Sequence, residues 1–301
     1  MARRRKGRDI HGVLLLDKPA GWSSNQAVQK VRWLFQARKA GHTGTLDPFA
    51  TGMLPICLGE ASKTAAFMLD ASKTYEARAR LGEATTTGDI EGETLRTEPV
   101  PDLDDAAIER VLTDFTGVVR QVPPMYSALK HEGQPLYRLA RAGREVEREA
   151  REVTIHRLER LAWRTPDLEF RVTCSKGTYI RVLAEDLAAA LGTCAHLRAL
   201  RRTASGPFAS GMVTLEEVER CAAAGEAEAL LLPPDAGLAD WPVVNLDAVA
   251  ANRFAHGNPV PAPQATQGLV RVYSETGLLL GLGEITTGNR LKPKRIMNLE
   301  A

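Results

Sequence analysis

Residues 41–52 gather an imidazole, several hydroxyls and a carboxylate into one short, glycine-rich segment. His42 lies a few positions before Asp47, and Pro48 follows Asp47 directly. Glycines let the backbone take positive φ angles or approach a ligand closely, and proline restricts the preceding residue to extended conformations. A carboxylate held in this way can act as a nucleophile or stabilise developing positive charge. A turn in which Asp47 bonds its own backbone accounts for the same residue types, so composition alone leaves both interpretations open.

Segments on both sides of this loop have the periodicity of regular elements that would position it. Residues 12–16 form an apolar run closed by a turn, and Ser23 or Ser24 can cap the helix that follows. Further strands are predicted at residues 53–58, 75–81, 153–163 and 168–175, and further helices at residues 60–69, 104–115 (with Gly117 as its C-cap) and 178–190. Strands mixed with helices in this order indicate an α+β body around a mixed, largely antiparallel sheet.

Two segments differ in character from this body. Residues 123–151 open with two prolines and carry many basic residues but little apolar pattern, so we interpret them as a surface insertion that can close over a ligand. Near the end of the chain, short alternating runs at residues 269–273 and 278–285 predict a β-hairpin. We therefore divide the chain into a main domain, residues 1–241, and a small β-rich domain, residues 242–301.

The composition is that of an ordinary globular protein. Of the 301 residues, 44% are apolar and 25% are charged. No apolar run approaches the roughly 18–20 residues that a membrane span requires, and no long apolar core follows the basic start, which argues against a signal peptide. Four cysteines are scattered without metal-ligand spacing. We therefore expect a cytoplasmic protein without a membrane contact or a metal site.

The net charge of +2 is too small to indicate a nucleic-acid partner by itself. Its distribution says more, because basic residues gather at residues 3–8 and again in the insertion at Arg138, Arg141 and Arg144. Lysines and arginines that neutralise phosphates release counterions, so these residues are candidate polyanion contacts. A solvated helix face explains the insertion equally well, since glutamates interleave with its later arginines.

Segments along the whole chain resemble, in order, the motifs of one family. They are residues 17–25, residues 41–55, Gly59-Glu60-Ala61-Ser62-Lys63-Thr64, Lys73-Thr74-Tyr75, Pro124-Met125-Tyr126-Ser127-Ala128-Leu129-Lys130, residues 174–181 and Leu200-Arg201-Arg202. Several motifs in order are far more specific than any one of them. The chain thus resembles the bacterial TruB-type tRNA pseudouridine synthases, and residues 242–301 are similar, more loosely, to that family's RNA-binding PUA domain.

The resemblance implies a reaction that needs no cofactor. The glycosidic bond of uridine-55 in the T-loop of tRNA is broken, the uracil rotates, and it rejoins the ribose through C5. The resemblance assigns the catalytic carboxylate to Asp47 and its cationic partner to Arg181. It places Tyr75 against the uracil, where it can assist proton removal from C5, and Tyr179 in the pocket lining. Leu200 is implied as an apolar wall, which would limit the access of water.

The same resemblance implies how the RNA is bound. The target uridine must leave its stack, and His42 matches the family residue that enters the folded RNA loop in place of displaced bases. The candidate phosphate contacts, which could instead be solvated charges, are Lys18, Lys63, Lys130, Arg138, Arg141 and Arg144. The implied partner is the T-stem-loop of tRNA. Nothing in the sequence indicates an obligate protein partner, so we expect a monomer.

Three other functions are weighed against this one. An RNA-binding folding factor whose catalysis is secondary would keep His42 and lose the carboxylate, whereas Asp47 is present. A glycoside hydrolase usually needs two carboxylates beside the bond, and the matched motifs supply one. A pseudouridine synthase with another RNA target or a guide-RNA partner is less compatible with the full-length match to stand-alone bacterial enzymes. Residue types leave open whether Asp47 attacks the base, attacks the ribose or acts as a base.

Overall fold

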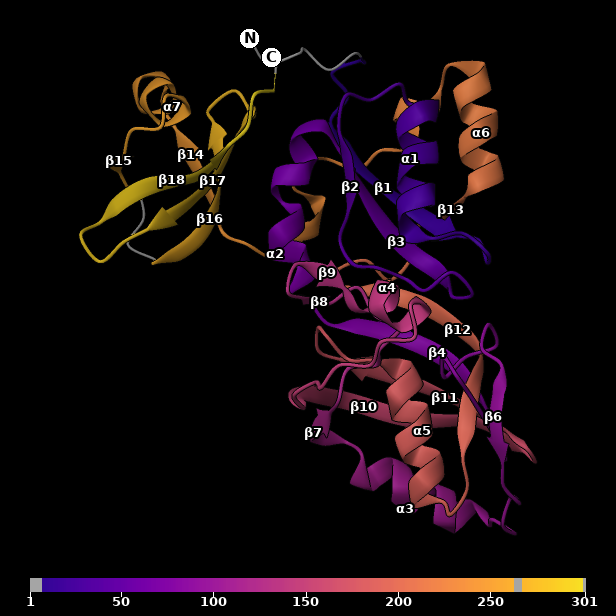
Figure 1. Cartoon of the computed structure of the whole chain (residues 1–301). Coiled ribbons are helices and arrows are strands. Elements are labelled where there is room, and N and C mark those ends of the chain that lie inside the picture. The colour runs from indigo at the N-terminus through magenta and orange to yellow at the C-terminus, as the bar shows by residue number, and fades with distance from the viewer. Residues whose placement is uncertain (1–6, 263–266, 300–301) are drawn as a thin grey trace.

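A computed structural model describes residues 7–262 and 267–299 (Figure 1). Within these residues, nine strands form one large sheet. Its spatial order is β13 (Val213–Thr214), β1 (Gly12–Lys18), β3 (Thr51–Leu58), β12 (Ala195–Ser205), β4 (Lys73–Leu81), β11 (Asp167–Cys174), β10 (Arg151–Arg164) and β7 (Gly117–Gln121), while β2 (Ala40–His42) pairs with β3. The β1–β13 and β3–β12 pairs are parallel and the others antiparallel, so the predicted mixed, largely antiparallel sheet is confirmed. The basic cluster expected at residues 3–6 lies outside the described residues.

Four helices cover one face of this sheet and share one apolar core with it. They are α1 (Ser24–Leu34), α3 (Asp105–Asp114), α5 (Ile180–Ala190) and α6 (Leu215–Ala224). The other face of β1 and β3 packs on α2 (Ala65–Leu69) and on the C-terminal domain. β1 and β3 are therefore apolar on both faces, whereas β4 and β11 alternate between the core and solvent.

Local signals at the ends of elements were predicted with mixed success. Ser23 caps α1 in a reciprocal pair with Gln26. The single helix predicted at residues 60–69 is instead two short ones, η1 (Gly59–Lys63) and α2, because the Thr64 N–H bonds the Ala61 carbonyl in a tighter turn. Gly117 is no helix C-cap: α3 ends at Phe115, and Gly117 begins β7 by pairing with β10.

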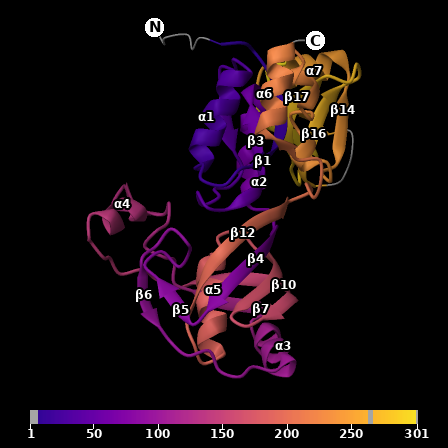
Figure 2. The same cartoon turned by 90° about the vertical axis from the view of Figure 1, so that its right-hand side faces the viewer.

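The insertion at residues 123–151 contains regular structure that its sequence did not predict. A short hairpin, β8 (Lys130–His131) and β9 (Gln134–Pro135), leads into α4 (Leu136–Arg141). Figure 2 shows α4 standing away from the large sheet, on the same side as the hairpin of β5 (Glu83–Thr85) and β6 (Thr94–Thr97). Leu136 and Leu139 are buried while the basic side chains are exposed, so α4 presents its charges to solvent.

The C-terminal part of the chain forms a five-stranded sheet with its own core. Its strands are β14 (Val243–Leu246), β16 (Gly268–Ser274), β17 (Leu279–Ile285), β18 (Arg290–Ile296) and β15 (Val260–Pro261), and α7 (Ala248–Ala255) packs against them. β16 and β17 form the hairpin that the alternating pattern predicted. The expected architecture, an α+β body followed by a smaller β-rich domain, is thereby confirmed.

A buried carboxylate fastens this domain to the main body. After η2 (Ala227–Leu230), the connecting segment contains η3 (Ala236–Leu238), preceded by Asp235, which is 2% exposed. The Asp235 carboxylate accepts hydrogen bonds from Arg271 at 3.1 Å and from the Tyr273 hydroxyl at 2.5 Å. Nearby, the rings of Phe67 and Trp241 meet edge to face with centroids 5.1 Å apart. The Asp235 contacts thus join the two domains, and the ring contact fixes the end of the connecting segment against α2.

We expect Asp235→Ala to lower the free energy of unfolding by about 3 kcal/mol, because it leaves the largely buried Arg271 guanidinium without its carboxylate. Urea denaturation followed by tryptophan fluorescence measures the change. The matched control is Asp240→Ala at an exposed neighbour, which should alter stability by no more than about 0.5 kcal/mol. Equal stability of the two variants would contradict the role given to Asp235.

Candidate active site

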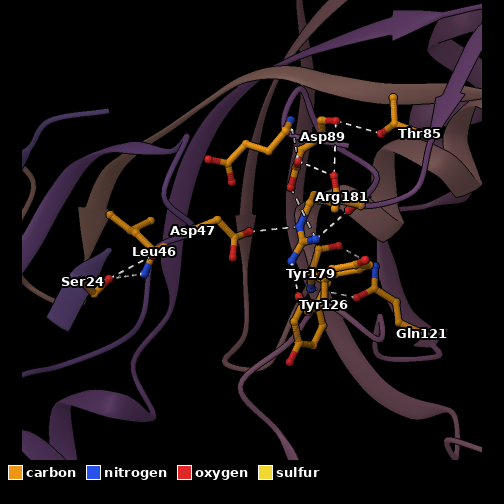
Figure 3. A network of polar contacts seen from close by, with 11 residues as sticks. Ser24, Leu46, Asp47, Thr85, Asp89, Gln121, Tyr126, Tyr179 and Arg181 are labelled. Atoms are coloured by element: carbon orange, nitrogen blue, oxygen red, sulfur yellow. Dashed lines mark hydrogen bonds and ion pairs between the residues drawn. The ribbon is translucent and has the colours of Figure 1, made fainter. Parts of the chain in front are cut away.

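The loop that carries Asp47 is irregular but fastened at several points. The Ser24 hydroxyl both donates to the Leu46 carbonyl at 3.0 Å and accepts from the Leu46 N–H at 2.8 Å (Figure 3). On the other side of Asp47, the Pro48 carbonyl accepts from Gly21 N–H at 2.8 Å. These bonds hold the backbone on both sides of Asp47, so its carboxylate is presented in one direction.

That carboxylate meets Arg181 in the first turn of α5. The Arg181 Nε lies 3.0 Å from Asp47 Oδ2, and the arginine side chain is 4% exposed. Its remaining nitrogens donate to the carbonyls of Thr87 at 2.6 Å and Tyr126 at 2.8 Å (Figure 3). The structure therefore brings together the carboxylate and the cation that the resemblance paired, and joins them to the β5–β6 hairpin and to the root of the insertion.

A second carboxylate in this network was missed in the sequence. Asp89 lies 3.5 Å from Arg181 Nη1, its side chain is 4% exposed, and it accepts from the Thr87 hydroxyl at 2.6 Å. Asp89 lies in a turn without helical or strand periodicity, so no pattern selected it. Gly88 was the available signal: its φ is +71°, and a Cβ there would lie 2.4 Å from the Glu185 carboxylate.

Opposing effects set the charge state of Asp47. Burial raises the pKa of Asp47 above its ordinary value, Arg181 pulls it back down, and the neighbouring Asp89 carboxylate raises it again. The net direction is upward, although the Asp47 side chain is still 35% exposed. Arg181 therefore favours the ionised form of Asp47, against the effect of burial.

Aromatic and apolar side chains complete the site. Tyr75 on β4 packs against the main core, and burial raises its pKa. Leu200 on β12 is 6% exposed and lies opposite Ala77 of β4. Tyr179 precedes α5, and its backbone exchanges two hydrogen bonds with the buried Gln121 side chain, at 3.0 and 3.3 Å (Figure 3). Gln121, a residue not expected from the sequence, thus fixes the start of the helix that carries Arg181.

His42 lies at the end of β2, ahead of the loop that carries Asp47. Burial, and then the positive charge of Arg202, lower the pKa of His42. Its Nδ1 accepts the Gly44 N–H at 3.2 Å, so the neutral ring carries its proton on Nε2. A neutral, half-buried imidazole presents a flat face without the desolvation cost of a cation, which suits contact with nucleic-acid bases.

The lysines expected to meet phosphates behave differently from one another. Lys18 is fully buried and donates to the carbonyls of Pro19, Trp22 and Pro48, and burial lowers its pKa to about 8. Both expectations for Lys18, phosphate contact and solvated charge, are therefore wrong. Lys63 pairs with Glu60 and donates to the Ile296 carbonyl at 2.7 Å, which places it at the domain junction. Lys130 is exposed.

The three arginines of the insertion expected to meet phosphates are all exposed. Arg138 and Arg141 lie on α4, and Arg144 follows the helix instead of continuing it. The guanidinium of Arg141 lies 5.8 Å from the centre of the Tyr137 ring. Two of the three arginines therefore lie on one short helix, and the third follows it in the chain.

Two other kinds of site are absent from the part of the chain that the structure describes. Within residues 7–262 and 267–299, no three His, Cys, Asp or Glu side chains are grouped closely enough to bind a metal ion. None of the described helices combines the length and apolar character needed to cross a membrane.

Comparisons with known proteins agree along nearly the whole chain. Residues 32–180 match the TruB family pseudouridylate synthase N-terminal domain, residues 181–239 the tRNA pseudouridylate synthase B C-terminal domain, and residues 242–297 the C-terminal domain of pseudouridine synthase II TruB. The tRNA pseudouridine synthase B of Pseudomonas aeruginosa is 54% identical over 96% of this chain and 97% of its own, and that of Pseudomonas putida is 52% identical over 97% of each.

Solved structures extend the likeness to the fold. A chain in the crystal structure of a Cbf5–Nop10–Gar1 complex is 28% identical, with a TM-score of 0.73 over 95% of this chain and 84% of that chain. A chain in an H/ACA RNP bound to a substrate RNA containing 2′-deoxyuridine has a TM-score of 0.74 at 24% identity over 99% of this chain and 92% of that chain, which supports the fold alone. Fold and site together define an enzyme of the pseudouridine synthase class. Within that class, the chain belongs to the TruB family of pseudouridylate synthases.

We expect Arg181→Met to raise the pKa of Asp47 further, because it removes the nearest positive charge from a carboxylate that burial already destabilises. A reaction that needs ionised Asp47 loses rate as the solution is acidified. In Arg181→Met this loss should set in at a pH about one unit or more above that of the wild-type enzyme. The measurement is the pH dependence of the single-turnover rate, or of the Asp47 carboxyl ¹³C shift where turnover is too slow. Arg198→Met, at an exposed site, is the control, and an unmoved acid limb in Arg181→Met would contradict the assignment.

Proposed function

We propose that this enzyme converts uridine-55 in the T-loop of tRNA into pseudouridine, with Asp47 as its catalytic carboxylate. The observation that carries the proposal is the 3.0 Å ion pair between Asp47 and the buried Arg181, formed where the structure also brings Thr87, Asp89 and the root of the insertion together. The names of the relatives, tRNA pseudouridine synthase B, support tRNA as the substrate.

The proposed reaction needs few chemical groups beyond these side chains. The N1–C1′ bond breaks, the uracil turns, C5 bonds to C1′, and the proton lost from C5 is balanced by one gained at N1. Asp47 in its ionised form attacks the nucleotide or stabilises positive charge on the ribose. Arg181 favours the ionised form of that carboxylate and so opposes the effect of burial. Reactants and product have the same atoms, so the step consumes no second substrate.

The apolar part of the site holds the detached base. Tyr75 provides a flat surface on which an extruded uracil can stack, and Tyr179 borders the same space beside Arg181. Leu200, almost fully buried, forms an apolar wall. Exclusion of water matters here, because water would compete with C5 for the ribose carbon.

RNA binding is assigned to surfaces around this pocket. We place His42 in the opened T-loop, in the space left by displaced bases, and the exposed arginines of residues 123–151 on the phosphates. Residues 1–241 act as the catalytic domain and residues 242–301 as a PUA-like RNA-binding domain. The enzyme works in the cytoplasm as a monomer without an obligate protein partner.

Asp47→Asn should abolish turnover, since the amide keeps the shape of the side chain and loses its charge. The assay is tritium release from tRNA transcripts labelled at uracil C5. tRNA affinity should stay within about tenfold of wild type, because the side chain contributes to the transition state more than to binding. Release confined to uridine-55, and lost in Asp47→Asn, is the expected result.

Other outcomes of this assay separate the rival functions. Substantial release from Asp47→Asn would remove Asp47 from its central role. tRNA binding without release from the wild-type enzyme would favour a folding factor. Release from an RNA other than the T-loop would leave the chemistry in place and overturn the choice of substrate.

The insertion gives a separate prediction about salt. If Arg138 and Arg141 each neutralise one phosphate, the double change to Ala should reduce the slope of log affinity against log salt by about 2. Fluorescence anisotropy with labelled tRNA, between low and physiological salt, measures this slope. The matched control is a double change of Arg157 and Arg164 to Ala on the exposed strand β10. A slope that falls equally in both double variants would argue against phosphate contacts specific to α4.

A further inference from the structure

Arg202 on β12 is buried without an acidic partner among its described contacts. Its side chain is the bulkiest of those fully buried in the described residues, and it is 1% exposed. Its described hydrogen-bond partners are neutral, since all three are backbone carbonyls. A buried guanidinium ordinarily has a carboxylate beside it, because its desolvation costs several kcal/mol. The burial of the Arg202 guanidinium therefore calls for a structural or functional explanation.

The three carbonyls belong to the segment that carries Asp47. Arg202 donates from Nε to Met53 O at 2.6 Å, from Nη2 to Gly44 O at 3.1 Å and from Nη1 to Thr45 O at 3.5 Å. One rigid, planar group thus ties the loop just ahead of Asp47 to the beginning of β3. Gly52 makes this possible, since a Cβ there, at φ +97°, would lie 2.2 Å from the Arg202 carbonyl oxygen.

The strand that carries Arg202 also borders the residue proposed to face the uracil. Arg202 and Tyr75 are directly opposite each other where β12 pairs with β4, so their side chains lie on the same face of the sheet. Burial raises the pKa of Tyr75, and the positive charge of Arg202 opposes that rise. Arg202 thus lies between the Asp47 loop, which its guanidinium binds, and the strand position of Tyr75.

We propose that Arg202 is a positioning residue of the isomerisation, which holds the Asp47 loop at a fixed separation from Tyr75 on the neighbouring strand. The inference rests on the proposed function, because it gives Arg202 this role only if Asp47 and Tyr75 act on a uridine. It differs from the role of Arg181, which contacts the Asp47 carboxylate itself.

Two substitutions separate the geometry of the group from its charge. Arg202→Lys keeps a cation but cannot span the same acceptors, and Arg202→Met removes both. The matched control is Arg201→Met on the same strand, whose guanidinium is partly exposed and pairs with Asp17 at 2.7 and 3.0 Å. Single-turnover tritium release, tRNA affinity and melting temperature are measured for each variant and for wild type.

The expected result is a single-turnover rate about 100-fold lower in both Arg202 variants with tRNA affinity within about threefold, and little change in Arg201→Met. Combining Arg202→Lys with Tyr75→Phe should cost less than the product of the two separate losses, because Arg202 acts partly through the position of the Asp47 loop relative to Tyr75. If Arg202→Met does not fold, the Lys variant carries the comparison.

The imidazole of His42 provides a readout that needs no turnover. Burial and then Arg202 lower the His42 pKa, so NMR titration should find that pKa raised in Arg202→Met and nearly unchanged in Arg202→Lys. Rates within about threefold of wild type, or losses of rate, affinity and melting temperature in parallel, would overturn the inference and leave a purely structural arginine. Absence of tritium release from wild type would overturn the proposed function as well, so the two failures are distinguishable.

Discussion

The site depends on one buried positive charge. The Arg181 guanidinium is held between Asp47 and Asp89 and has the carbonyls of Thr87 and Tyr126 as further acceptors. Such a charge is tolerated only when its donors are all used, and these acceptors come from the loop that carries Asp47, the β5–β6 hairpin and the root of the insertion. Satisfying one arginine therefore brings three separate segments to a common point. The same contact opposes the rise in the pKa of Asp47 that burial causes.

Hydrogen bonds from buried cations to backbone carbonyls also hold the loop in place. An irregular segment cannot satisfy its own carbonyls as a helix or strand does, and here buried cations donate hydrogen bonds to them. Lys18 reaches Pro48 from β1, and Arg202 reaches Gly44 and Thr45 from β12. These donors lie on the two strands that flank β3 in the sheet, so the sheet fixes the position of the loop. A loop can thus be free of regular structure and still present one carboxylate in one direction.

How far the sequence predicts this protein depends on the range of each interaction. The strands near residues 12–16 and 168–175 and helix α5 were found because their periodicity is local. The pairing of Asp47 with Arg181 was expected only from the resemblance, since no pattern along the chain reports a contact between distant segments. Lys18 looked exposed because a lysine in a turn usually is, and its burial depends on carbonyls that the fold brings to it. Asp89 gave no signal except the glycine before it.

β3 connects the site to the second domain. The loop that carries Asp47 precedes this strand, and η1 follows it. At the η1 end, Glu60 accepts the Asn298 N–H and Lys63 donates to the Ile296 carbonyl. Eight residues of extended chain at roughly 3.3 Å each span about 26 Å. β3 is buried on both faces, so the strand resists bending and keeps this distance between its ends. On the proposed function, a fixed distance between the Asp47 loop and a second RNA-binding surface would favour RNAs of one shape, with little need to read their bases.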